Sequence, residues 1–314
     1  RRSDGYVGKP PELGTGVFAM DTGNGSTTIP TFDSTFPVDM SLVRNRYDGS
    51  GSNWELGSRL LGNKFVYPNL TSSEATSGKY HWDSNAGVHT SASGEYDSDS
   101  FAWMFKRYAG FDVVAYTGDG VAGRQISHSL NKAAEMIWVK NRDDSYENWI
   151  VGHKGLNGGS NPWDYELGLN STGSESNNVN KWNDTAPSST HFTLGNGDAV
   201  NKNGDDYISM LFTSVDGMSK VGYYSGQATE LTITTGFAPR FLILKRINGA
   251  DNWWVFDTTR GWVSGNNSKL LQLDSSAAES TQDFGAPTST GFTLVGDSTR
   301  INAAGNDYIY YCHA

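Results

Sequence analysis

The chain has 314 residues, of which 37 are glycine, 12% are aromatic and 18% are charged, and its formal net charge is −10. This acidic balance argues against nucleic acid as a partner, because nucleic-acid-binding proteins carry a basic surface. No apolar stretch approaches the roughly 18 residues of a membrane-spanning helix, so we expect no membrane insertion. Turn residues combined with aromatic residues are typical of an all-β protein.

In chain order, residues 1–14 contain two adjacent prolines and several glycines, which predicts an extended lead-in. Three similar segments follow, at 15–110, 111–217 and 218–314. Their period is that of a whole small domain, far above the period of a solenoid unit, and it predicts three tandem homologous domains. Because the joints between them are short, we expect the domains to touch and to hold a fixed orientation.

Within each repeat the strand signals recur in the same order. In the second repeat an opening strand (FDVVAY) is followed by a glycine turn, an apolar run ending in a basic residue (EMIWVK) and a strand entered through Asn-Trp. A strand that leads into a Ser/Thr-rich motif comes next, and an aromatic strand (DYISMLF) closes the repeat. Seven or eight short strands without a helical period predict an antiparallel β-sandwich, of jelly-roll or lectin-like type, in each repeat.

The chain contains one cysteine, Cys312, so disulfide bonds cannot stabilise the repeats. A segment of about 100 residues is large enough to bury a hydrophobic core. We therefore expect each domain to be stabilised by a core of its own.

A tryptophan recurs at the same place in every repeat, as Trp54, Trp149 and Trp253, at separations of 95 and 104 residues. Aromatic faces suit the stacking of sugar rings, so these residues could form a ladder of sugar platforms. Recurrence within an alternating strand is more typical of a core position, and we interpret the three tryptophans as the centre of each core.

Aromatic residues that do not recur are better candidates for an exposed ligand-binding surface. Four of them lie in loops or turn-rich segments: Tyr47, Tyr146, Trp163 and Trp262. Loops carry binding residues more often than the scaffold does.

A basic residue that ends the apolar run and a glutamate that ends the Ser/Thr motif also recur. We expect them to form structural ion pairs within each repeat, not a catalytic pair. The predicted pairs are Arg44 with Glu74, Lys140 with Glu175, and Lys245 with Glu279.

Signals for catalysis and for metal binding are weak. The nucleophile-elbow, zinc-protease, P-loop and dinucleotide-binding motifs are absent, and the histidines do not recur between repeats. We expect no catalytic residues and no cofactor. The loop at 201–206 (NKNGDD) comes nearest to a Ca²⁺ site, but it lacks the EF-hand order of ligands, and tight-turn chemistry explains it equally well.

The second repeat carries the motifs YTGDG, SHSL, EMIWVKNRD, LGLNST, KWNDTAP, FTLG and GDDYISMLF. With these motifs the chain resembles a repeated domain of uncharacterised structural proteins from tailed bacteriophages of the marine and cyanobacterial kind. The resemblance covers roughly residues 15–314. It implies a component of the virion surface, and it offers no catalytic residues to carry over.

On this basis we expect a tail fibre or surface appendage that mediates attachment to the host, as a homo-oligomer in contact with other virion proteins and with a host cell-surface glycan. Two alternatives stay open. One is a capsid fibre or decoration protein that binds no receptor, and the other is a carbohydrate-binding, lectin-like module. A polysaccharide-degrading enzyme would need a cleft with paired carboxylates, which the sequence does not single out.

Overall fold

The computed structural model describes residues 13–26, 30–47, 52–76, 78–90, 96–107, 110–265 and 267–314. Apart from its last two residues, the predicted lead-in at 1–14 lies outside this part of the chain. The regular secondary structure of the described residues is mostly β-strand, and none of their helices is long and apolar enough to cross a membrane.

The first repeat contains η1 (Gly14–Gly16), β1 (Phe18–Thr22), β2 (Phe32–Asp33), β3 (Met40–Asn45), β4 (Glu55–Ser58), β5 (Lys64–Val66), β6 (Ala75–Thr76), β7 (Tyr80–His81), β8 (Gly87–Thr90) and β9 (Ser100–Phe105). The second contains β10 (Phe111–Thr117), β11 (Arg124–Ser127), β12 (Met136–Asn141), β13 (Ile150–His153), η2 (Leu156–Gly159), η3 (Pro162–Asp164), β14 (Tyr165–Gly168), β15 (Ser176–Asn177), α2 (Val179–Trp182), β16 (His191–Leu194), α3 (Asp198–Asn201) and β17 (Asp206–Phe212). The third contains β18 (Ser219–Ser225), β19 (Leu231–Thr234), β20 (Phe241–Arg246), β21 (Trp253–Asp257), β22 (Ser268–Gln272), β23 (Ser280–Gln282), β24 (Pro287–Thr288), β25 (Gly291–Leu294) and β26 (Asp307–His313).

Each repeat folds into one six-stranded sheet and one smaller sheet, all antiparallel. The six-stranded sheets, here called the inner sheets, have the orders β1-β9-β3-β4-β5-β6, β10-β17-β12-β13-β14-β15 and β18-β26-β20-β21-β22-β23. The outer sheets are β2-β8-β7, β11-β16 and β19-β25-β24. The predicted all-β class with three tandem β-sandwiches is therefore confirmed, and the three inner sheets share one topology.

The apolar run of each repeat is the third strand of its inner sheet, and it is buried on both faces. In β12, Met136 and Trp138 face one hydrophobic cluster, whereas Ile137 and Val139 face another. This alternation follows from the two-residue period of a strand. An uninterrupted apolar sequence is what a strand between two packed layers requires.

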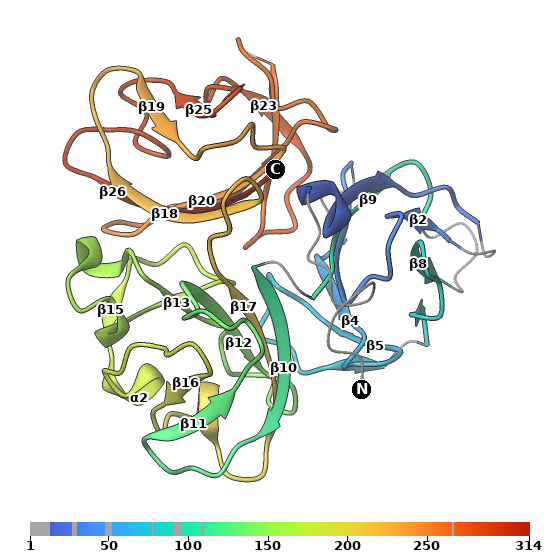
Figure 1. Cartoon of the computed structure of the whole chain (residues 1–314), viewed down its shortest axis with the longest axis vertical. Coiled ribbons are helices and arrows are strands. Elements are labelled where there is room, and N and C mark those ends of the chain that lie inside the picture. The colour runs from blue at the N-terminus through green and yellow to red at the C-terminus, as the bar shows by residue number, and fades with distance from the viewer. Residues whose placement is uncertain are drawn as a thin grey trace.

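The outward face of each inner sheet packs on its outer sheet, and each repeat has a cluster of this kind. The inward faces of all three inner sheets meet in one larger cluster that contains residues of every repeat. Figure 1 shows the repeats as three lobes around a common centre, blue to cyan, green to yellow, and orange to red. The expectation that each domain relies on its own core is therefore wrong, because the largest core is shared.

The third repeat also contacts the first, so the three lobes form a closed ring. The rings of Phe18 and His313 stack with their centroids 4.7 Å apart. The guanidinium of Arg240 donates to the carbonyl oxygens of Phe18 at 3.2 Å and of Ala314 at 2.6 Å. Gly14 and Ala314 lie so close that a Cβ added at Gly14 would be 3.0 Å from the Cβ of Ala314.

Two four-residue helices in the second repeat were not expected from the sequence. The side chain of Asn178 caps α2 by accepting a hydrogen bond from the backbone N–H of Asn180 at 3.2 Å. Trp182 at the end of α2 is buried against the core of the repeat. A helix of one turn is too short to show a helical period in the sequence.

Candidate functional site

The three recurring tryptophans are core residues and also link the repeats. Their exposed fractions are 0, 0 and 1% for Trp54, Trp149 and Trp253. Each indole N–H donates to a backbone carbonyl of another repeat: Trp149 to Tyr67 at 2.8 Å, Trp253 to Gly168 at 2.9 Å, and Trp54 to Gln272 at 2.8 Å. The core interpretation is confirmed. Rings buried this deeply cannot serve as sugar platforms.

The recurring basic residues do not form the predicted ion pairs. Lys140 Nζ donates to the carbonyl oxygens of Thr71 at 2.7 Å and Glu147 at 2.8 Å, and Lys245 Nζ donates to that of Thr172 at 3.1 Å. Thr71 and Thr172 belong to the Ser/Thr motif of the preceding repeat. The guanidinium of Arg44 likewise bonds to the carbonyls of Ser276 and Ala277 in the third repeat.

The prediction thus named the right segments but paired them wrongly, because the basic side chain meets the backbone of a neighbouring repeat and not a carboxylate of its own. Burial lowers the pKa of Lys140 and of Lys245 to about 8. The carbonyl oxygens that surround each amine keep the buried group hydrogen-bonded.

The recurring glutamates have different partners in each repeat. Glu74 pairs with Lys64 and with Arg142 of the second repeat, both at 2.7 Å. Glu279 pairs with Arg260 at 2.9 Å and Lys269 at 3.3 Å. The second repeat differs from the other two at one position: Lys64, Tyr165 and Lys269 occupy the same register in the three repeats.

Because Tyr165 replaces the lysine in the second repeat, Glu175 has no cationic partner among the described residues. Its carboxylate accepts the backbone N–H of Asn157 at 2.6 Å. Burial raises the pKa of Glu175 above its ordinary value.

Two of the four predicted loop aromatics are buried, and for them the prediction of an exposed binding surface is wrong. Trp163 is 6% exposed and packs edge-on against Trp182, with centroids 5.7 Å apart. Trp262 is 2% exposed and donates its indole N–H to the carbonyl of Gly285 at 3.1 Å. Their turn-rich surroundings misled the prediction, because those turns fold the rings back onto the inner sheets.

The other two loop aromatics are exposed, Tyr47 by 55% and Tyr146 by 90%. They lie in equivalent hairpin loops, Tyr47 after β3 and Tyr146 after β12. The corresponding loop of the third repeat, after β20, carries no aromatic residue. We call the end of the ring that bears these three loops the hairpin end.

A surface cavity of about 340 Å³ adjoins Tyr146 at the hairpin end, lined by Asp143, Asp144, Ser145, Tyr146, Lys202 and Asp205. Lys202 Nζ lies 3.3 Å from a carboxylate oxygen of Asp144 and 3.3 Å from one of Asp205. The backbone N–H of Tyr146 donates to Asp144 Oδ1 at 2.8 Å, which fixes the loop beneath the ring. An exposed ring thus borders a cavity walled by charged groups.

The charges in this cavity are stabilised by their partners. The backbone N–H of Tyr146, and then Lys202, hold the pKa of Asp144 below its ordinary value. Hydrogen bonds to Asp144 and Asp205 raise the pKa of Lys202. Asp144 and Lys202 therefore stay ionised near neutral pH. They present fixed hydrogen-bond donors and acceptors beside the ring.

The loop at 201–206, the nearest sequence match to a Ca²⁺ site, uses its polar side chains internally. Asn201 is buried and donates to the carbonyls of Val121 and Gly195, both at 3.0 Å. The carboxylate of Asp205 accepts from Asn141 at 2.8 Å and faces Lys202. Across the described ranges, no group of three or more His, Cys, Asp or Glu side chains is placed to hold a metal ion.

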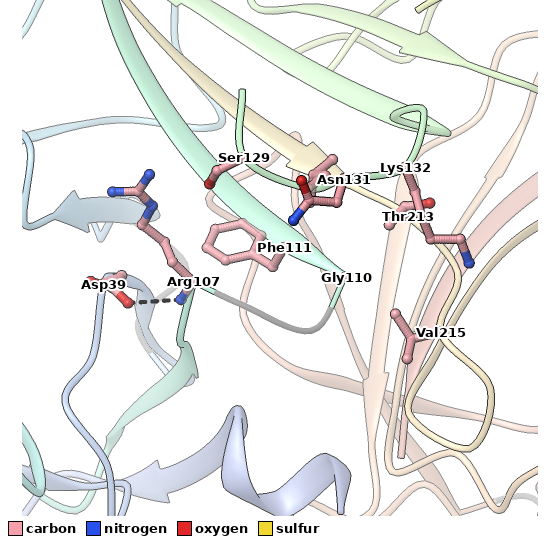
Figure 2. Close-up of a pocket in the computed structure, with 10 residues that line it drawn as sticks. Asp39, Arg107, Gly110, Phe111, Ser129, Asn131, Lys132, Thr213 and Val215 are labelled. Carbon is pink, nitrogen blue, oxygen red and sulfur yellow. Dashed lines mark hydrogen bonds between the residues drawn. The ribbon is translucent and has the colours of Figure 1, made fainter. Parts of the chain in front are cut away.

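A larger cavity of about 560 Å³ lies at the opposite end of β17, where the first repeat joins the second. Figure 2 shows Phe111 at its centre between the side chains of Arg107 and Lys132. The backbone N–H of Arg107 donates to Asp39 at 2.7 Å (dashed in Figure 2). The sequence does not reveal this cavity, because Asp39, the segment 129–132 and the joints between repeats lie far apart along the chain.

Comparison with known proteins gives one family. Residues 67–314 match the family described as "Domain of unknown function (DUF7483)". The chain belongs to this family. No curated protein matches it. The DUF7483 match crosses both boundaries between repeats, so the family's unit is longer than one repeat, in agreement with a core that the repeats share.

Proposed function

We propose that this DUF7483 protein is a structural component of a bacteriophage particle that attaches to a host-surface glycan through the hairpin end. The observation that carries the proposal is the position of Tyr146. Its ring is 90% exposed and borders a cavity lined by Asp144, Lys202 and Asp205. An aromatic face beside a few fixed polar groups is the usual composition of a sugar-binding site.

The packing of the three repeats into a closed ring supports a binding role. The three hairpin loops are held by buried tryptophans and by buried cations that cross from repeat to repeat. Binding residues on a rigid scaffold lose little conformational entropy when a ligand binds. The resemblance of the repeat motifs to phage structural proteins is the basis for placing this binding unit on a virion.

Two variants of Tyr146 test the glycan site. Full-length protein is titrated with host lipopolysaccharide and capsular polysaccharide, and binding is followed by calorimetry. If the ring stacks on a sugar, Tyr146→Ala abolishes binding, whereas Tyr146→Phe keeps the ring and retains it. Both variants should have the same melting temperature as the wild type, because the side chain is almost fully exposed. Binding that survives Tyr146→Ala would contradict this site.

The location on the particle needs a separate measurement. An antibody against the full chain is applied to purified particles and located by immunogold electron microscopy. Label on fibres or at the tail tip is the expected result. Label spread over the capsid, combined with no binding of polysaccharide, would favour a decoration protein that binds no receptor.

A further inference from the structure

A pair of stacked tyrosines joins the first two strands of the inner sheet in the second and third repeats. Tyr116 and Tyr207 are cross-strand partners whose ring centroids lie 5.0 Å apart, and Tyr224 and Tyr308 repeat this arrangement at the same distance. Tyr207 and Tyr308 are fully buried. The rings therefore occupy part of the interior at the hairpin end of each of these repeats.

Small residues take both places in the first repeat. By register, Ser100 occupies the position of Tyr207 and Tyr308, and Gly23 occupies that of their partners. A Cβ added at Gly23 would lie 2.3 Å from the backbone oxygen of Tyr96, so the chain at Tyr96 runs where a tyrosine side chain would begin. The first repeat thus lacks the two rings that the other repeats stack at this point.

A second exchange places a carboxylate beside Ser100. Glu55 occupies the position of Ile150 and Trp254 in the other repeats. Its Oε2 accepts hydrogen bonds from the hydroxyls of Tyr80 at 2.7 Å and Tyr96 at 2.6 Å. Burial, and then the charge of Glu55, raise the pKa of Tyr80, so its hydroxyl stays protonated and donates. Two donors hold the carboxylate in one orientation.

Ser100 and Glu55 line the same cavity, which has a volume of about 220 Å³ and lies at the hairpin end of the first repeat. Of the nine described residues that line it, only Val43 has no polar group in its side chain. A polar cavity of this size holds water or a ligand, because only apolar cavities stay empty. Pockets for drug-sized ligands begin at roughly 300 Å³, so the occupant is smaller.

The lining indicates the chemistry of the occupant. Arg44 and Glu55 are the charged residues among the nine, and their formal charges cancel, which favours an uncharged ligand. The oxygen of the Asn53 side chain accepts from Asn69 at 2.8 Å, and its NH₂ group is a donor. An acceptor at Glu55 and a donor at Asn53 suit hydroxyl groups, since each hydroxyl both donates and accepts.

We propose that this cavity of the first repeat binds one uncharged, polyhydroxylated ring of the size of a single hexose. The Glu55 carboxylate accepts from hydroxyls of the ligand, and Asn53 donates to one of them. Tyr67 and Tyr96 supply the aromatic surface of the wall. The site lies in another repeat than Tyr146 and does not use that residue, so it goes beyond the proposed function and does not rest on it.

The test uses the full-length protein and saturation-transfer NMR with D-glucose, D-galactose, D-mannose and N-acetyl-D-glucosamine, each added separately. At least one of these sugars is expected to bind. Ser100→Tyr, which copies the other two repeats, should abolish binding by filling the cavity. Glu55→Gln keeps the shape of the side chain and an acceptor for the tyrosines. It should weaken binding by about tenfold or more, because hydrogen bonds to a charged acceptor are lost.

Glu230→Gln is the matched control, because it neutralises an exposed glutamate of the third repeat and should leave binding unchanged. Thermal melting identifies any variant that fails to fold. Each variant is also made in a Tyr146→Ala background, so that a sugar bound at Tyr146 cannot account for the signal.

The proposal is overturned if none of the four sugars binds the wild type, which would leave a cavity that holds only water. Binding that persists in both Ser100→Tyr and Glu55→Gln would overturn it as well. Binding that is present in the wild type and absent from Tyr146→Ala belongs to the other site. That result would support the proposed function and overturn this inference.

Discussion

The indole N–H of Trp54 in the first repeat donates a hydrogen bond of 2.8 Å to the carbonyl of Gln272 in the third. The same bond joins the second repeat to the first and the third to the second. The first and third repeats are therefore joined by the same contact as repeats that are adjacent in the sequence, and the three repeats form a closed ring.

Truncation of one central tryptophan should affect the whole ring. We expect Trp54→Ala to lower the free energy of unfolding by about 3–5 kcal/mol, because it leaves a cavity in a core shared by three repeats. Denaturation followed by circular dichroism should still show a single transition, shifted to lower denaturant concentration. Early loss of the first repeat alone, with the other two unaffected, would contradict a shared core.

Substitution of the buried lysine tests the contacts between repeats. Lys140→Met should reduce stability by about 3 kcal/mol, because it removes the donor from buried carbonyl oxygens of two repeats. Lys140→Arg should cost much less, since Arg44 makes the equivalent contacts in the first repeat. Urea denaturation of the two variants provides the comparison. Equal losses would show that the hydrogen bonds are unimportant and that only side-chain volume matters.

Two of the recurring glutamates should differ in their response to neutralisation. Glu279→Gln is expected to destabilise by about 3 kcal/mol, because it breaks a buried pair with Arg260. Glu175→Gln should be neutral or stabilising: burial raises the pKa of Glu175, and an amide oxygen can still accept the N–H of Asn157. Melting temperatures at pH 7 test both variants, and a large loss from Glu175→Gln would contradict this assignment.

Acid should weaken the contact of the third repeat with the first. Burial lowers the pKa of His313 to about 4, below its ordinary value, so the folded protein resists its protonation. As the pH falls from about 6.5 to 4, the unfolded chain takes up a proton that the folded chain does not, which removes about 3 kcal/mol of stability. Above about pH 6.5, where His313 is neutral in both the folded and the unfolded chain, this loss of stability is absent.

Replacement of this histidine provides the check. Phe105 and Phe212 occupy the position of His313 in the other repeats, so His313→Phe should fold. Denaturation at pH 7.5 and pH 4.5 should then show a smaller acid loss in the variant than in the wild type. His153, whose pKa burial lowers to about 3, keeps part of the acid sensitivity. An unchanged difference between the two pH values would exclude His313 as a cause.

The β-sandwich class could be predicted because its signals are local. Strand alternation, glycine turns and the apolar run ending at Lys140 are all visible within one repeat. The burial of the central tryptophans was also predictable, since Trp54 recurs in register with its counterparts. Local patterns, however, do not show which repeat a side chain faces. For this reason the sequence predicted a separate core for each repeat, and for Lys140 a partner within its own repeat.

The candidate site was predictable only in part. Tyr146, like Tyr47, was predicted as a loop aromatic that does not recur at one fixed position of the repeat, and the structure exposes both residues. Trp163 has the same sequence character, but it is buried and its ring packs against Trp182 of the same repeat. The cavity around Phe111 is lined by parts of the chain that lie far apart in the sequence, and their proximity appears only in the folded structure.

The closeness of Gly14 to Ala314 has a mechanical consequence. If the chain is pulled by polypeptide attached at both ends, tension enters the ring at Gly14 and leaves at Ala314, only one residue contact away. The load then acts mainly across the interface of the third repeat with the first, at Arg240 and Phe18. The second repeat, with Tyr146, stays outside the line of force. The surface around Tyr146 would keep its shape under such a load.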